Sequence, residues 1–221
     1  MNLFIDIETI PDQRVGAFDA ILADIKPPTN YKKPETIDKW MAEQGKAAAH
    51  EKWLRTALDG AQGEVISIAY AFDDDDIVCI DRDLGSDVVT ERVILETLLG
   101  KFVDEKKRGA IWTGHNVEWD IRFLWQRALI LGVAWAGLIP VNRRDRVFCT
   151  MREWAGYRDT ISLDKLCRAF GIKGKGGTTG ADVWPMVEQG RYDELRQYNI
   201  DDVRKVRDIY RRMHPQTEAR A

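Results

Sequence analysis

Asp6 and Glu8, near the start of the chain, have the residue types and the spacing of a metal site. Apolar and polar residues alternate around them, so in a β-strand both carboxylates lie on one face. Two like charges about 4 Å apart repel by roughly 4 kcal/mol at an effective dielectric of 20, and a cation between them removes that repulsion. The pair therefore indicates either a site for divalent cations or a strand face that is open to solvent.

Two further pairs have the spacing of one helical turn. Asn116 and Asp120 follow a Gly-His turn, and Tyr198 and Asp202 lie in a segment with helical periodicity near the C-terminus. Residues four apart project from the same face of a helix. Taken alone, Asn116 and Asp120 are better explained as capping residues, because the first turn of a helix favours Asn and Asp. Neither pair alone indicates a catalytic site. The order of all three motifs along the chain is more informative.

Taken in order, the three motifs resemble the DEDD family of 3′–5′ exonucleases, and the tyrosine is typical of its DEDDy branch. The histidine branch would need a histidine five residues before Asp202, where this chain has Gln197. The strings Phe4–Thr9 and Tyr198–Asp202 look most like the proofreading exonucleases of family B DNA polymerases. The resemblance spans most of the chain outside residues 12–63.

The resemblance implies a ribonuclease H-like fold and a site for two divalent cations, Mg²⁺ or Mn²⁺. The ligands that it implies are Asp6, Glu8, Asp120 and Asp202. Hard oxygen ligands suit these cations, which can activate water and stabilise a leaving 3′ oxygen. Tyr198 would orient the attacking water. The Tyr-x-x-x-Asp spacing selects Asp202 in place of its neighbour Asp201, which we expect to be a solvated helix residue.

Four residues are expected to contact the substrate, again by resemblance. Thr9 would meet the terminal nucleotide, and Asn116 would reach the substrate strand. Trp119 stands where the family usually has Phe or Tyr, and the larger ring could still stack on a base. The family also tends to have a lysine near the scissile phosphate between its second and third motifs. The glycine-rich stretch here offers Lys173 and Lys175, of which Lys175 is preferred.

The elements that must position these residues follow from the periodicity of the sequence. Alternation and short apolar runs predict strands at residues 2–10, 64–72, 77–81, 110–113 and 147–149. Helical spacing predicts helices over residues 88–107, after Asn116, and from about Tyr192 onward. Three strands followed by alternating helices and strands indicate the α/β class, here a mixed five-stranded sheet flanked by helices.

Residues 12–63 do not fit a minimal domain of this kind. A gap of this length between two strands is uncommon in a compact domain and often carries function. Its apolar residues have helical spacing, so we expect a helical insertion between the first and second strands. The expected organisation is one exonuclease domain over residues 1–214, followed by a short tail at 215–221.

The composition excludes several classes of protein. The chain has 221 residues and a formal charge of −3, which argues against coating nucleic acid by bulk charge. Basic residues still cluster at Arg143, Arg144 and Arg146 and between Arg204 and Arg212. Solvated helix faces explain most of them, but a few could line a strand-binding groove with salt-sensitive phosphate contacts. The three cysteines form no Cys-x-x-Cys pair, and no apolar run approaches the ~18 residues of a membrane span. With no secretory signal evident, we expect a soluble cytoplasmic protein without a membrane partner.

The leading hypothesis is a metal-dependent 3′–5′ exonuclease that releases nucleoside monophosphates from the 3′ ends of single-stranded DNA. Because the chain is too short to include a polymerase, a role in proofreading or repair would need a separate polymerase or repair partner. A 3′–5′ exoribonuclease is the nearest alternative, since the same kind of site occurs in RNA-processing enzymes. A catalytically silent nucleic-acid binding module is the third hypothesis.

Overall fold

A computed structural model describes residues 1–85, 89–134, 136–174 and 176–215. Its five-stranded sheet has the strand order β3-β2-β1-β4-β5. The strands are β1 (Asn2–Ile10), β2 (Glu64–Phe72), β3 (Val78–Asp81), β4 (Ile111–Gly114) and β5 (Val147–Cys149). β1 pairs with β4 and β4 with β5 in parallel, whereas β2 and β3 pair antiparallel. The mixed five-stranded α/β sheet, of ribonuclease H-like type, is therefore confirmed.

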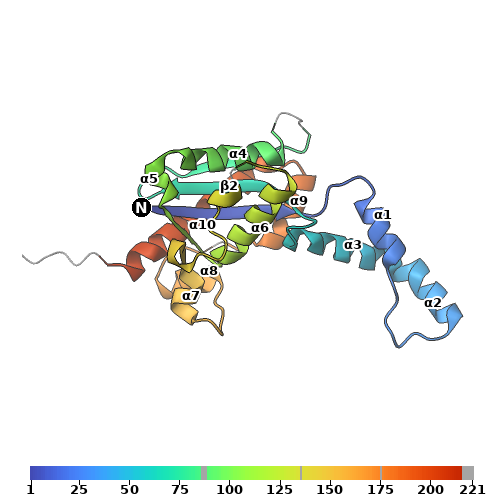
Figure 1. Ribbon diagram of the computed structural model, residues 1–221. Coiled ribbons are helices and arrows are strands. Elements are labelled where there is room, and N and C mark those ends of the chain that lie inside the picture. Colours follow the sequence, from blue (N-terminus) through green and yellow to red (C-terminus); the bar gives the residue numbers. More distant parts are fainter. Residues whose placement is uncertain (86–88, 135, 175, 216–221) are drawn as a thin grey trace, which may run out of the picture. The chain divides into compact units, whose positions relative to one another are not determined.

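The register of the sheet brings the carboxyl ends of β4 and β5 together, alongside the first half of β1. Phe4 of β1 pairs with Thr113 of β4, and Gly114 of β4 pairs with Cys149 of β5. β1 and β2 lie next to each other (Figure 1), and the N–H of Asp73 after β2 donates to the carbonyl of Asn2, so these strands run antiparallel. Ligands of open α/β sheets bind outside the carboxyl ends of parallel strands. Because β1 continues past the end of β4, its second half lies at this edge of the sheet.

Helices cover both faces of the sheet. They are α4 (Glu91–Gly100), α5 (Glu105–Arg108), α6 (Val117–Ile130), α7 (Thr150–Ala155), α8 (Leu163–Ala169), α9 (Val183–Glu188) and α10 (Tyr192–Met213). Leu3, Ile5 and Ile7 of β1 belong to the core cluster that contains the buried residues of α4 and α6. Phe4 belongs to a second cluster, with residues of α8 and α10. Because side chains alternate along a strand, Asp6 shares the face of Phe4 and is directed toward α10.

The predicted elements agree closely with those observed. The predicted strands differ from the observed ones by no more than one residue at either end. The helix predicted over 88–107 is shorter than expected, because α4 begins at Glu91 after the N-cap Thr90 and a 3₁₀ turn at Lys101–Val103 separates it from α5. Val88, the first residue of that prediction, lies outside the described residues.

The chain divides into two compact units, one formed by Met1–Glu8 and the chain from Val65 onward, the other by Thr9–Glu64. The second unit contains α1 (Ala17–Asp24), α2 (Pro34–Trp40), a π-helical turn (Met41–Gly45), α3 (Lys46–Leu54) and a 3₁₀ turn (Arg55–Leu58). The helical character expected for residues 12–63 is thus observed. A single domain over 1–214 stays a prediction, and residues 216–221 of the expected tail lie outside the described chain. None of the described helices has the length and apolar character needed to cross a membrane.

Candidate active site

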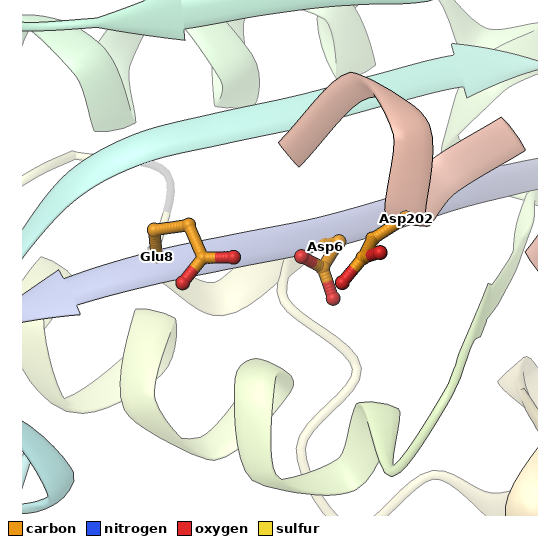
Figure 2. Close-up of side chains that lie close together, drawn as sticks. All are labelled: Asp6, Glu8 and Asp202. Atoms are coloured by element: carbon orange, nitrogen blue, oxygen red, sulfur yellow. The ribbon is translucent and has the colours of Figure 1, made fainter. Parts of the chain in front are cut away.

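Three carboxylates meet beside the central strand. Asp6 and Glu8 of β1 and Asp202 of α10 each present an oxygen, and these oxygens all lie within 4.8 Å of one another. Figure 2 shows the carboxylates of Asp6 and Asp202 close together, with Glu8 farther along the same strand. Glu8 is 7% exposed and Asp202 is 2% exposed, while Asp6 is half-buried. The pairing of first and third motifs expected from the sequence is therefore present in space.

The amphipathic pattern of α10 explains why Asp202 faces β1. The buried residues of this helix form one stripe: Leu195, Tyr198, Asn199, Asp202, Val203, Val206 and Ile209. Val203, Val206 and Ile209 pack in the same core cluster as Phe4, which fixes the rotation of the helix about its axis. Tyr198 and Asp202 belong to that stripe, so burial of the apolar residues directs them toward the strand. Asp201 instead bonds to Gln197 and Arg204 at the helix surface, as expected of a solvated residue.

Lys205 provides a positive charge to the carboxylate cluster. Its ammonium nitrogen lies 3.2 Å from Oδ1 of Asp202, and the two side chains are 12% and 2% exposed. In the sequence, Lys205 belongs to the basic cluster between Arg204 and Arg212, which is interpreted mainly as a solvated helix face. Its spacing of one turn from Asp202 permits the contact, but the same spacing is common among surface lysines, so the sequence alone does not identify it.

Asp120, the carboxylate of the second motif, is buried against β1. Burial raises its pKa from 3.8 to about 7, although hydrogen bonds from its own backbone and from the backbone of Ile7 act in the opposite direction. Ile7 lies between Asp6 and Glu8, so Asp120 reaches the same segment of the strand. The end of β4 also approaches this strand closely at Gly114, where a Cβ would lie 2.9 Å from the carbonyl oxygen of Ile5. Asp120 is not a member of the three-carboxylate group within 4.8 Å.

The raised pKa of Asp120 predicts a pH-dependent stability in the absence of metal. Protonated Asp120 is favoured in the folded state, so its contribution to stability is complete below about pH 4 and is lost as the pH rises through about 7. Asp120→Asn should therefore melt at least about 3 °C above the unmodified protein at pH 8 in EDTA, and the difference should vanish toward pH 4–5. Asp159→Asn, at an exposed position, is the control and should melt like the unmodified protein at every pH. If the melting temperatures of Asp120→Asn and the unmodified protein changed in parallel with pH, this explanation would be contradicted.

Tyr198 lies at a hollow of about 700 Å³ beside α10. The hollow is lined by Tyr198, Gln197 and Lys205 from the helix and by Lys173 and Gly174 from the glycine-rich stretch, among others. Lys173, one of the two lysines expected near the scissile phosphate, is thus on the same hollow as Tyr198. Lys175, the preferred candidate, lies outside the described residues.

Comparison with protein families finds one family that matches most of the chain. Residues 55–218 match a family described as predicted 3′–5′ exonucleases related to the exonuclease domain of PolB. The match spans well over half of the chain. The chain belongs to this exonuclease family. A comparison with curated proteins finds no match.

The family match and the structure contribute different parts of the site. The matched residues include Asp120, Tyr198 and Asp202 but begin after Asp6 and Glu8. The structure adds those two carboxylates, because β1 lies at the centre of the sheet and brings them within 4.8 Å of Asp202. The expected resemblance to the exonuclease domain of family B polymerases is thereby confirmed.

Asp6 is contacted by a buried hydrogen-bonded series of side chains: Asn199, Ser67 and Cys79. These three residues were not identified from the sequence. Asn199 is fully buried, and only one orientation of its amide pairs donors with acceptors. In that orientation the nitrogen donates to Oδ2 and to the backbone oxygen of Asp6, both at 3.3 Å, and the oxygen accepts from the Ser67 hydroxyl at 2.9 Å. The Cys79 sulfur lies 3.1 Å from that hydroxyl, and burial raises the pKa of the thiol to about 11, which keeps it protonated as a donor.

Asn199 is therefore expected to be a positioning residue of the exonuclease site. Asn199→Ala should lower the rate of hydrolysis by about 10-fold or more and raise the metal concentration needed for half-maximal activity, as is typical when a partner of a metal ligand is removed. Ser67→Ala, which leaves the amide in place, should have a smaller effect on both quantities. Melting temperatures in EDTA separate loss of folding from loss of positioning. An unchanged metal requirement in Asn199→Ala would show that the amide does not orient Asp6.

The structure describes three of the four residues that are expected to contact the substrate. The Thr9 hydroxyl donates to the backbone oxygen of Ala57 at 2.7 Å within the second unit. Asn116 is exposed at the N-cap of α6, but its side chain makes no capping hydrogen bond, so the capping explanation does not account for that side chain. The Trp119 ring lies 5.2 Å from the Phe123 ring and packs on the core, with part of its surface accessible. Contact of these residues with a substrate stays a prediction.

Proposed function

We propose that this protein is a metal-dependent 3′–5′ exonuclease that hydrolyses single-stranded DNA from its 3′ end to nucleoside monophosphates. The observation that carries the proposal is the convergence of Asp6, Glu8 and Asp202 within 4.8 Å, in a chain that belongs to an exonuclease family. We assign Asp120 to the same centre because its carboxylate contacts the strand between Asp6 and Glu8.

The residues present fit a pair of divalent cations. Their donors are carboxylate oxygens, the ligands that Mg²⁺ and Mn²⁺ prefer. The raised pKa of Asp120 is the behaviour of a buried carboxylate whose negative charge is poorly compensated by the protein itself. Asp6, Glu8, Asp120 and Asp202 would hold the cations. Bound there, two such ions would supply an activated water and would stabilise the charge that develops on the leaving 3′ oxygen.

The remaining groups of the site have separate roles in this proposal. Tyr198 orients the water through its hydroxyl, which can donate one hydrogen bond and accept another. Lys205 holds Asp202 in place through their ion pair and contributes positive charge on the side of the hollow. Lys173 is at the same hollow and is suited to bind a phosphate oxygen there.

Time courses on 5′-labelled single-stranded DNA test the proposal. With Mg²⁺ or Mn²⁺ the product ladder should shorten from the 3′ end, and both EDTA and Asp6→Ala should abolish it. An RNA oligonucleotide of the same sequence is the second arm, and faster degradation of RNA would overturn the preference for DNA. Tight binding of either strand without hydrolysis in any metal would favour the catalytically silent binding module.

A further inference from the structure

A second hollow, of about 220 Å³, lies on the other flank of α6 from Asp120. It is bounded by α6, β5, α7 and the turn before β5. Four arginines line it: Arg122, Arg143, Arg144 and Arg152. This concentration of guanidinium groups contrasts with the formal charge of −3 of the whole chain.

Carboxylates balance part of this positive charge, since Glu118 and Glu153 also line the hollow. Arg152 pairs with Glu118 at 2.9 Å, and Arg143 pairs with Asp145 at 2.9 Å. In the part of the chain that the structure describes, no carboxylate forms an ion pair with Arg122 or Arg144. The guanidinium of Arg122 makes one long hydrogen bond, of 3.4 Å, to the side chain of Asn142. The hollow therefore presents two guanidinium groups that can bind an anion, and guanidinium groups match phosphate oxygens in geometry.

An exposed aromatic ring lies beside these arginines. Tyr157 is 73% exposed, and the guanidinium carbons of Arg144 and Arg152 lie 5.6 Å and 5.2 Å from the centre of its ring. Basic groups that bind the backbone, combined with an aromatic side chain on which a base can stack, are typical of proteins that bind single-stranded nucleic acids. A simple inorganic anion would not need the ring.

The geometry of α6 connects this hollow with the carboxylate centre. Two residues turn a helix by about 200°, so Glu118 and Asp120 project from opposite flanks. Arg122, one turn after Glu118, lines the hollow on the same flank as Glu118. The first turn of α6 thus lies between Asp120 and the hollow, and a helix with its side chains is roughly 10–12 Å across. Asn116 is exposed at that first turn, and its side chain makes no capping hydrogen bond.

We propose that the Arg122/Arg144 hollow is a subsite for the phosphodiester backbone of the substrate strand, a few nucleotides upstream of its 3′ end. This inference rests on the proposed exonuclease function. The strand leaves the carboxylate centre past Asn116, around the first turn of α6. Its phosphates bind Arg122 and Arg144, and a base stacks on Tyr157. The subsite holds long strands and makes no contribution to hydrolysis of a fragment too short to reach it.

The double variant Arg122→Gln/Arg144→Gln tests the subsite in the full chain. For a single-stranded DNA of about 12 nucleotides, KM should rise about tenfold or more, and the dependence of log KM on log salt should become shallower by roughly one. For a dinucleotide, kcat and KM should stay unchanged. Arg92→Gln/Arg211→Gln removes the same charge from α4 and α10 and should leave both substrates unaffected. An unchanged KM for the longer strand would overturn the proposal.

Two further measurements separate the possible outcomes. Fluorescence anisotropy measures the affinity for the same strand in EDTA, and this affinity should fall about tenfold in the double variant. The measurement tests the subsite even if the protein does not hydrolyse DNA. Inhibition by a nucleoside monophosphate should be the same in the double variant and the unmodified protein. A change confined to that inhibition would overturn the proposal and assign the hollow to the released product.

Discussion

Asp202→Asn should lower the rate of 3′-end hydrolysis by at least about 10³-fold, because it removes a carboxylate from the proposed metal centre. Asp202 is 2% exposed and lies with Asp6 and Glu8 in the group whose oxygens are within 4.8 Å of one another. Asparagine keeps the shape of the side chain but removes the negative charge that a divalent cation requires. The rate is measured on 5′-labelled single-stranded DNA at saturating Mn²⁺ and Mg²⁺.

The neighbouring Asp201 supplies the matched control. Asp201→Asn makes the same chemical change one residue earlier, on a side chain that bonds to Gln197 and Arg204 and also lines the hollow beside α10. Because Asp201 is outside the group of three carboxylates, its rate at saturating DNA should stay within about twofold. Equal losses in the two variants would contradict the assignment of Asp202 as a metal ligand. Melting temperatures of both variants in EDTA exclude unfolding as the cause of a loss.

The strands and the carboxylate pair of β1 could be predicted because their signals are local. Alternation around Asp6 and Glu8 places both on one face, and the observed strand Asn2–Ile10 has the predicted bounds. The third motif could be placed because Tyr198 and Asp202 are one turn apart on an amphipathic helix. What the sequence does not contain is the rotation of that helix against the sheet, which depends on how Val203 and Val206 pack.

Asn199 and Lys205 were missed for that reason. Both residue types are common on solvated helix surfaces, and only tertiary packing shows that Asn199 is fully buried against Asp6 and that Lys205 pairs with Asp202. The arginine hollow has a similar origin. The cluster at 143–146 indicated residues that could line a groove, but Arg122 is far in sequence from Arg144, so only tertiary packing shows that the two line one hollow.

Tyr198→Phe should lower kcat for single-stranded DNA by about 10²-fold while leaving KM and the metal concentration for half-maximal activity within about twofold. The substitution removes a single hydroxyl from a buried side chain at the hollow beside α10, and the ring that packs there is kept. In the proposed mechanism that hydroxyl orients the water and does not bind the cations. The effect should therefore fall on the chemical step alone.

Tyr192→Phe is the matched control on the same helix. The Tyr192 hydroxyl accepts a hydrogen bond from the backbone N–H of Leu84 at 3.0 Å, away from the carboxylate centre, so its loss should leave kcat unchanged. If Tyr198→Phe instead raised the metal requirement as Asp202→Asn does, the tyrosine would act through the metal centre. If it left kcat unchanged, the water would be positioned by other groups. A loss in kcat alone would separate the two roles proposed for α10, in which Asp202 holds the cations and Tyr198, one turn earlier, places the nucleophile.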